Sequence, residues 1–268
     1  MSDDPTRFVG SIPEHYDRGL GPVIFAGPAD VAARLAASHR PSRVLETAAG
    51  TGIATRRMRD MLPTEAAIVA TDLNAAMLEI SRGKFRVGEN VAFHAADATD
   101  LPFADGEFDV VLCQFGVMFF PDKDKAYREA RRALAPGGHY IFTVWDTTDH
   151  NRFGRVVVDV MRSASDVDPP PFMSVPFGYA AIDPIKASLL AAGFDGLRVE
   201  LVRMMGAIDD FDRFASGLVF GSPLVEQIRA RGFEPDDLRR AVARSLRDEF
   251  GEAGSTPLQF MLFDAWRA

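Results

Sequence analysis

The feature that most constrains the fold is a glycine-containing turn that joins an apolar run to a stretch of helical spacing. Residues 43–45 are typical of the end of a buried strand, and residues 53–62 carry apolar side chains at helical spacing. Between them lie Gly50 and Gly52, which can adopt positive φ and let a ligand approach the backbone. The free N–H groups of the following helix would point to the same place. This order of elements is typical of nucleotide-binding loops, although a plain tight turn also explains the two glycines.

Three successive predicted strands end in a carboxylate. Glu46 ends the first strand, Asp72 ends a strand expected at residues 67–71, and Asp97 closely follows one expected at residues 91–95. Adjacent parallel strands present their ends at one edge of a sheet, where such folds bind ligands. Asp72 is placed to accept the hydroxyls of a ribose. Asp97 could accept from the amine of a base, and a helix cap or a solvated loop acid is the alternative for it.

A helix is expected at residues 75–82, shortly after Asp72. Asn74 is placed to cap this helix with its side chain. Met77 would project from the first turn, where its thioether could lie against the flat face of a base. The residues expected at this edge of the sheet therefore predict a ligand that contains a nucleoside.

These pieces resemble the class I S-adenosylmethionine-dependent methyltransferases, in particular the small-molecule branch that includes the ubiquinone and menaquinone biosynthesis enzymes. The resemblance covers residues 16–145. It is carried by the matching segments at residues 46–52, 72–77, 97–103, 108–111 and 134–139. One position departs from the pattern, because the family loop often has glycine where this chain has Ala48. We expect Ala48 to keep an ordinary φ and to leave slightly less space.

The resemblance implies S-adenosyl-L-methionine as cofactor, S-adenosyl-L-homocysteine as product, and twelve cofactor contacts. The implied contacts are Tyr16 and Glu46 at the methionine end, with Glu46 near the ammonium, Gly50, Thr51 and Gly52 beneath the methionine and ribose, Asp72 on the ribose hydroxyls, Leu73 and Met77 beside the adenine, Asp97 and Ala98 at its amine and edge, and Gln114 with Phe115 as the floor after the fourth strand. For the segment that contains Tyr16, a plain surface helix is the competing interpretation.

The charge pattern around the loop agrees with that cofactor. S-adenosylmethionine carries a sulfonium, an ammonium and a carboxylate but no phosphate, so its site gains from acids and needs no basic clamp. The chain has three acids at strand ends and no lysine or arginine between Glu46 and Thr55. A pyrophosphate ligand would tolerate this pattern less well.

The alternation of strands and helices predicts an α/β fold with a doubly wound, mostly parallel, seven-stranded sheet of Rossmann-like type. Strands are expected at residues 43–45, 67–71, 91–95, 109–114, 139–145, 197–204 and 260–263, and helices at residues 53–62, 75–82, 123–134, 151–164 and 183–192. We expect one structural domain in three parts. These are an N-terminal helical segment over the cofactor at residues 1–42, the cofactor-binding core at residues 43–146, and the rest of the sheet with a helical substrate cap at residues 147–268.

The cap would combine residues 147–179 with a helical insertion at residues 209–252. Within the first of these segments, an irregular, aromatic-rich stretch that begins with Asp168 and Pro169 follows the helix expected at residues 151–164. Its large apolar side chains are of the kind that line small-molecule cavities. They are Phe172, Met173, Phe177, Met204, Met205, Phe211, Phe214, Leu218 and Phe220. Packing of the added helices against one another explains these residues equally well.

The composition of the chain limits which classes of binding partner are expected. A net charge of −8 argues against nucleic acid, because such proteins normally present a basic stripe. The single cysteine, Cys113, lies in an apolar run and is expected to be a buried small hydrophobe, which suits a reducing cytoplasm. No uninterrupted run of 18 apolar residues is present, so no membrane span is expected. We expect a cytoplasmic protein with a small-molecule substrate, as a monomer or a homodimer.

Catalytic residues do not follow from the sequence. Methyl transfer to an activated carbon can rely on positioning and exclusion of water, and a base is needed only if the acceptor must lose a proton. His15 and His150 lie in segments expected to border the cavity, but neither is assigned as a base, and no spacing of His, Cys and acids resembles a metal site. Two other functions stay open: an NAD(P)-dependent oxidoreductase, although Thr55 occupies its third glycine position, and a non-catalytic cofactor-binding subunit.

Overall fold

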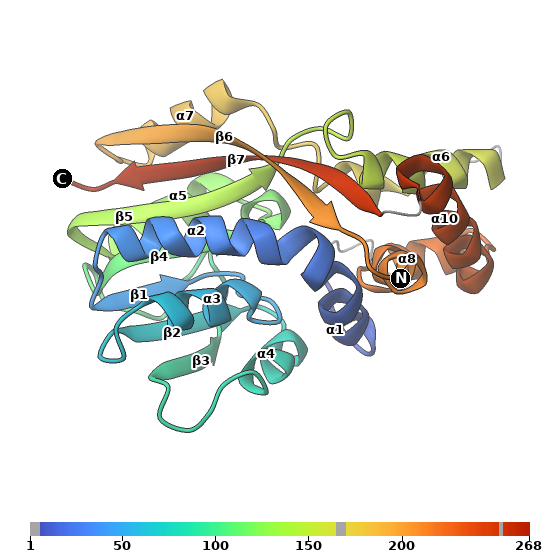
Figure 1. The fold of residues 1–268 in the computed structure, drawn as a ribbon. Helices are drawn as coiled ribbons and strands as arrows, with labels where there is room; N and C mark the ends of the chain where they lie inside the picture. Colours follow the sequence, from blue (N-terminus) through green and yellow to red (C-terminus); the bar gives the residue numbers. More distant parts are fainter. Residues whose placement is uncertain (1–5, 165–169, 252–253) are drawn as a thin grey trace.

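The computed structural model describes residues 6–164, 170–251 and 254–268. Within them, seven strands form one sheet in the order β3-β2-β1-β4-β5-β7-β6 (Figure 1). The strands are β1 (Arg43–Glu46), β2 (Ala67–Asp72), β3 (Val91–Ala95), β4 (Phe108–Gln114), β5 (Leu134–Trp145), β6 (Gly196–Ala207) and β7 (Ser255–Trp266). β7 runs antiparallel to both of its neighbours, and all other pairs are parallel. The predicted seven-stranded, mostly parallel sheet is confirmed.

Helices cover both faces of the sheet. They are α1 (Ile12–His15), the π-helix η1 (Tyr16–Phe25), α2 (Ala26–Ser38), α3 (Ile53–Met61), α4 (Ala75–Arg82), the 3₁₀ turn η2 (Val117–Phe119), α5 (Lys123–Ala133), α6 (Arg152–Ala164), the 3₁₀ turn η3 (Pro171–Ser174), α7 (Ile182–Ala191), α8 (Phe211–Phe220), α9 (Leu224–Ala230) and α10 (Pro235–Phe250). In Figure 1, α2 and α3 lie in front of the sheet, and α5 and α7 lie behind it. The added helices α6, α8 and α10 gather at one end of the sheet (Figure 1).

The fifth strand begins earlier than the sequence predicts. β5 starts at Leu134, directly after α5, whereas the sequence indicated a strand from residue 139. The ladder with β4 shifts register after Leu134 and resumes at His139, so the residues between them form a bulge within the strand. Gly137 has φ 79° there, and its N–H donates to the Arg267 carbonyl at 2.7 Å. The Pro-Gly-Gly sequence therefore bends a strand instead of separating two elements.

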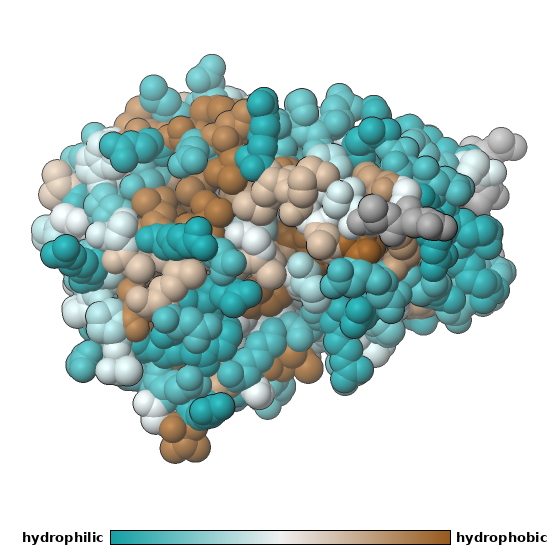
Figure 2. All heavy atoms as spheres, in the orientation of Figure 1, coloured by the Kyte–Doolittle hydropathy of each residue, from teal (hydrophilic) through white to brown (hydrophobic). Residues whose placement is uncertain are grey.

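The last two strands are each 12 residues long and pair along their whole length. β6 is an edge of the sheet, and edges invite pairing with other chains unless charges interrupt them. Arg198 and Glu200 are exposed on it, whereas Leu201 is 46% and Met205 60% exposed. Hydrophobic residues accordingly gather over the part of the surface where β6 and β7 lie (Figure 2).

Residues 12–38 form one continuous helical run made of α1, η1 and α2. By length and composition, Ile12–Ser38 is the one candidate membrane span among the described residues, although the sequence indicated none. Of its most apolar window, 56% is buried inside the structure, where the run packs on α3, α8 and the sheet. The core helix of a soluble protein passes the same test, so this candidate is weak evidence for a membrane.

η1 and α8 approach each other through two glycines. A Cβ added at Gly19 would lie 2.6 Å from the Gly217 Cα, and one added at Gly217 would lie 2.8 Å from the Gly19 carbonyl carbon. Because both obstacles are backbone atoms, no side-chain rotation could relieve the clash. This contact fixes the N-terminal helix against the inserted helices.

We expect Gly19→Ala to lower the free energy of unfolding by about 1–3 kcal/mol, the usual cost of overpacking. Gly21→Ala in the same helix is the matched control, because its Cβ would meet only the flexible end of Ile53, at 3.2 Å. Alanine is favoured over glycine in a helix, so this control should be neutral or slightly stabilising. Denaturant unfolding of both variants measures the difference. Equal stability of the two would contradict the close contact.

Candidate functional site

A cavity of about 760 Å³ lies at the carboxyl edge of the parallel strands, between the sheet and the added helices. Nine of the twelve residues expected at the cofactor line it: Tyr16, Gly50, Asp72, Leu73, Met77, Asp97, Ala98, Gln114 and Phe115. The other three, Glu46, Thr51 and Gly52, are buried beside the cavity and are not on its described wall. The fold therefore brings nine of the twelve positions onto one surface and packs the other three behind it.

Asp72 ties the glycine loop to the second strand. Its Oδ2 accepts from the Gly50 N–H at 2.9 Å, and its Oδ1 accepts from the Asn74 N–H at 2.8 Å. The side chain is 7% exposed, and burial raises the pKa of the Asp72 carboxyl against the opposing effect of these hydrogen bonds. Asp72 thus holds the loop that forms one wall of the cavity.

Asn74 begins α4 but does not cap it as the sequence predicts. Its side chain makes no cap hydrogen bond. Instead, Nδ2 donates to the Thr6 carbonyl at 2.9 Å, and Oδ1 accepts from the Phe8 N–H at 3.2 Å. The amide therefore fastens the N-terminal segment across the edge of the cavity, and Thr6 and Phe8 also line it.

Glu46 is buried and polar, at 1% exposure. Its Oε2 accepts from the Thr55 hydroxyl at 2.5 Å. Burial raises the pKa of Glu46 to about 8, the Thr55 hydrogen bond opposes that rise, and the nearby charge of Asp72 adds to it. At neutral pH this side chain is therefore mainly protonated, and an approaching cation would favour its ionised form.

The remaining loop residues account for the tight turn into α3. Gly52 has φ 78°, and a Cβ there would lie 2.0 Å from the Ser81 hydroxyl oxygen, so glycine is required. The hydroxyls of Thr51 and Ser81 are buried and have no hydrogen-bond partner in the described structure. Polar atoms of this kind are costly to bury unless a ligand or water satisfies them.

Ala48 departs from its expected conformation. The sequence indicated an ordinary φ, but the residue has φ 51° in the left-handed region. The loop lies close to Gly116, because a Cβ added at Gly116 would lie 2.4 Å from the Ala48 Cβ, so glycine at position 116 leaves the room that the Ala48 side chain occupies. A left-handed alanine costs about 1–2 kcal/mol relative to a right-handed one.

We expect Ala48→Gly to raise the free energy of unfolding by about 0.5–1 kcal/mol. Glycine relieves the left-handed strain, and its greater freedom in the unfolded chain offsets part of the gain. Ala49→Gly is the matched control, because Ala49 is not among the residues with positive φ and should lose stability. Thermal unfolding of both compares the two positions. A destabilised Ala48→Gly would contradict the strain.

Gln114 and Phe115 form the floor at the end of β4. Phe115 has φ 55°, its N–H donates to the Thr143 hydroxyl at 3.0 Å, and its ring stacks on Trp145 with centroids 3.9 Å apart. The Gln114 amide donates to the Phe25 carbonyl at 2.9 Å. This pair joins the sheet to η1 beneath the cavity.

Tyr16 lies on η1 with its ring against the cavity. The ring stacks on Phe25 at 4.8 Å and meets Phe8 edge-on at 5.9 Å. Burial raises the pKa of its phenol well above the ordinary value, so the group stays protonated. A plain surface helix is therefore the wrong interpretation of this segment, whereas contact with the methionine end stays a prediction.

Asp97 lies on the wall with Ala98. Its Oδ1 accepts from the N–H of Thr99 at 2.8 Å and from the Thr99 hydroxyl at 2.9 Å. These local bonds fix the carboxylate after β3, so the loop-acid interpretation and a ligand-binding role are compatible.

The far half of the cavity is apolar and is built by the added helices. Of the nine large cap residues, Phe172, Met173, Phe177 and Leu218 line it. The others serve elsewhere: Phe211 and Phe214 are buried among the helices, Phe220 lies against His15, Met205 is exposed, and Met204 packs near Gly27. Phe119 and Trp145 complete the aromatic wall. Both expectations for the cap residues are thus met by different members of the set.

Lys123 is a wall residue that the sequence did not single out. It is the one lysine or arginine on the described lining. Its Nζ donates to the Phe120 carbonyl at 2.9 Å and lies 4.9 Å from the centre of the Tyr179 ring, and burial lowers its pKa. The available signal was its position at the first turn of α5, directly after the cap residue Asp122.

The histidines do not supply a base on the described wall. His15 hydrogen-bonds the Ser216 hydroxyl at 3.0 Å and lies against Phe220. Neither it nor His150 is on the described lining, nor are the other three histidines, all of which lie within the described residues.

Comparison with known proteins defines the class. Residues 44–138 match the sequence model of the methyltransferase domain. This match, which covers less than half of the chain, and the strand order above support a class I S-adenosylmethionine-dependent methyltransferase. The resemblance drawn from the sequence is confirmed.

Individual relatives match only part of the chain. The chain is 41% identical to the ubiquinone/menaquinone biosynthesis C-methyltransferase UbiE of Idiomarina loihiensis over 106 residues, 38% of this chain and 42% of that protein. It is 31% identical to UbiE of Hahella chejuensis over 166 residues, 60% of this chain and 59% of that protein. The chain thus spans about half the length of these relatives.

Structural comparison extends over nearly the whole chain. Phosphoethanolamine N-methyltransferase 2 of Haemonchus contortus, solved with S-adenosylhomocysteine, superposes with a TM-score of 0.58 at 16% identity. The superposition covers 97% of this chain and 61% of that one. At that identity the likeness establishes the fold alone.

Proposed function

We propose that this chain is an S-adenosylmethionine-dependent methyltransferase that acts on a small, partly apolar molecule. The observation that carries the proposal is a single cavity that joins two unlike halves. One half presents Asp72 and Asp97 beside the glycine loop, and the other is lined by aromatic side chains from the added helices. Such a space can hold a cationic nucleoside next to an apolar acceptor.

The donor set fits the cofactor. Asp72 would take the ribose hydroxyls, Met77 would lie against the adenine, and Asp97 would accept from its amine. The part of the described cavity wall beside the glycine loop carries the acids. Lys123 is the one lysine or arginine on the described wall, and it belongs to α5 and not to the loop. A sulfonium gains from this arrangement, whereas a pyrophosphate would find no basic partner at the loop.

The chain's own contribution is positioning and exclusion of water. When bound, the cofactor supplies a methyl group already activated by its sulfonium. The aromatic wall, including Phe172 and Phe177, would hold the acceptor in a dry space opposite it, and Lys123 would offer a donor to an acceptor oxygen. With no histidine on the described wall, we favour an acceptor that needs no histidine base. The relatives named for C-methylation support this class of reaction.

The other functions are less well supported. An NAD(P) oxidoreductase would need a phosphate-binding loop, but Thr55 lies where the third glycine would be, and its hydroxyl is bonded to Glu46. A non-catalytic subunit would share the fold, since fold does not define activity. We propose a cytoplasmic location and leave the choice between monomer and homodimer to measurement.

Two titrations and one transfer assay test the proposal. We expect calorimetry to show binding of S-adenosylhomocysteine and not of NADH. Tritium from labelled S-adenosylmethionine should then pass to members of a panel of small apolar acceptors. NADH binding without S-adenosylhomocysteine binding would overturn the proposal, and cofactor binding without transfer to any acceptor would favour the non-catalytic subunit.

A further inference from the structure

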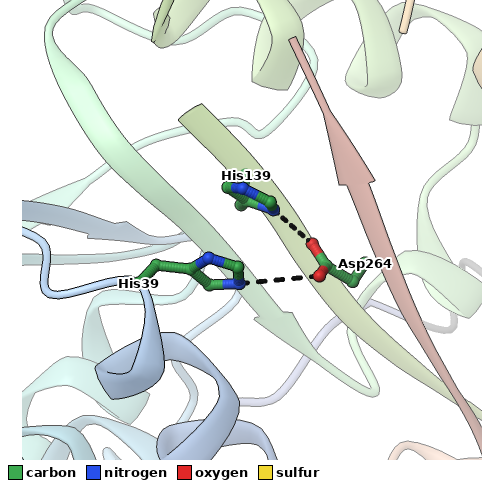
Figure 3. A group of neighbouring side chains, drawn as sticks. All are labelled: His39, His139 and Asp264. Atoms are coloured by element: carbon green, nitrogen blue, oxygen red, sulfur yellow. Dashed lines mark hydrogen bonds and ion pairs between the residues drawn. The ribbon is translucent and has the colours of Figure 1, made fainter. Parts of the chain in front are cut away.

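A cluster of two histidines and one aspartate lies on the sheet, away from the cavity. His39 follows the last turn of α2, His139 lies in β5 and Asp264 lies in β7. Figure 3 shows the two imidazoles and the carboxylate converging from these three elements. The residues are so far apart in sequence that no spacing could reveal them, and the sequence accordingly indicated no metal site.

The three side chains are close enough to share one ion. His139 Nδ1 lies 2.7 Å from Asp264 Oδ1, and His39 Nε2 lies 3.5 Å from Asp264 Oδ2. The two imidazole rings stack with centroids 3.6 Å apart. One potential ligand atom from each residue lies within 4.8 Å of the other two. Ligand atoms on one tetrahedral zinc ion are about 3.4 Å apart, so small side-chain rotations would close the set.

His39 carries an unsatisfied atom that points to a ligand. Its Nε2 is buried and has no hydrogen-bond partner in the described structure, because 3.5 Å to the carboxylate is too long for a good bond.

Access and charge also suit a cation. The side chains of His39 and His139 are 23% and 22% exposed, and that of Asp264 is 9% exposed. The two imidazoles are therefore partly exposed to solvent, whereas the carboxylate is nearly buried.

We propose that His39, His139 and Asp264 bind a divalent transition-metal ion of the zinc type. Imidazole nitrogens select such ions over magnesium and calcium, which prefer shells of oxygen ligands. Three protein ligands leave the fourth position to water. The ion would tie the end of α2 to β5 and β7 and would stabilise the fold.

The site is independent of the proposed reaction. His139 lies four residues before Thr143, which pairs with the wall residue Gln114, so roughly 13 Å of strand separates His139 from the cavity wall. Metal binding should therefore leave the affinity for S-adenosylhomocysteine unchanged. The rival explanation is a metal-free tie in which Asp264 accepts hydrogen bonds from the histidines.

Calorimetric titration of the chelator-treated full chain with zinc chloride tests the proposal. We expect one ion per chain, a raised melting temperature with zinc, and neither effect with magnesium. Replacing a residue that merely orients a metal ligand costs about 10–100-fold in affinity, so His39→Ala and Asp264→Asn should each weaken zinc binding by at least about 100-fold. His150→Ala is the matched control and should bind as the unchanged chain does.

Several results would overturn the site. They are failure of the unchanged chain to bind zinc, equal binding of magnesium, and equal loss of zinc binding in His150→Ala. The titration of the unchanged chain decides the matter even if a variant fails to fold, and circular dichroism identifies such a variant. Unaltered zinc affinity in a folded His39→Ala would also contradict the assignment.

Discussion

Asp72→Ala is expected to weaken binding of S-adenosylhomocysteine by about 1.5–3 kcal/mol, which is about 10- to 150-fold in Kd. The proposed site uses this carboxylate for charged hydrogen bonds to the ribose. The same oxygens hold the N–H groups of Gly50 and Asn74, so the variant would also loosen the loop. Calorimetric titration measures the loss.

Asp72→Ala can weaken binding in two ways, by loosening the glycine loop and by removing the contact with the ribose, and these two effects must be separated. Thr71→Val is the matched control, because the Thr71 hydroxyl donates to the Glu46 carbonyl at 2.9 Å and Thr71 is not on the described cavity wall. It weakens the same end of β2 without removing a ribose partner. Equal affinities for Asp72→Ala and the unchanged chain would refute the placement of the ribose, and equal losses in both variants would assign the effect to the loop.

Binding of S-adenosylhomocysteine is expected to strengthen about tenfold per pH unit from pH 6 to pH 8 and then to level off. Burial raises the pKa of Glu46 to about 8, so the ligand-free chain holds this proton at neutral pH. We propose that the ammonium of the cofactor lies beside Glu46, which requires the carboxylate form, so binding below pH 8 would release the proton. Titrations in buffers of different ionisation enthalpy measure the release.

Two controls isolate Glu46. Glu46→Gln should abolish the pH dependence, because it cannot ionise. Methylthioadenosine lacks the amino-acid part of the cofactor, so its affinity should not change with pH. The folding stability of the ligand-free chain should change with pH in the opposite direction to the binding affinity. The folded state holds a proton on Glu46 that the unfolded state releases, so stability should fall as the pH rises from about 4.5 towards 8. If the affinity of the unchanged chain does not vary with pH, the placement of the ammonium beside Glu46 is wrong.

Much of the sheet could be predicted, because buried parallel strands are continuous apolar runs. β3 and α4 have the predicted bounds, and Asp72 and Asp97 reach the cavity because they follow neighbouring strands. The local sequence shows where each strand ends, and in a parallel sheet the ends of neighbouring strands lie at the same edge. The positions of the added helices were also visible in their apolar spacing.

What escaped prediction depends on contacts between distant parts of the chain. Ala48 is left-handed and lies against Gly116, where only a glycine leaves room for its side chain. Asn74 binds the N-terminal segment instead of capping α4, and this choice depends on where residues 6–8 pass. Asp168 and Pro169, which the sequence places in the irregular segment of the cap, lie outside the described residues.

The most direct test of the account is a crystal structure of the chain with S-adenosylhomocysteine. We predict that the ribose hydroxyls contact Asp72, that the adenine lies beside Met77 with its amine at Asp97, and that the sulfur faces the aromatic wall. A ligand bound elsewhere, or one that leaves both carboxylates without contact, would contradict the account.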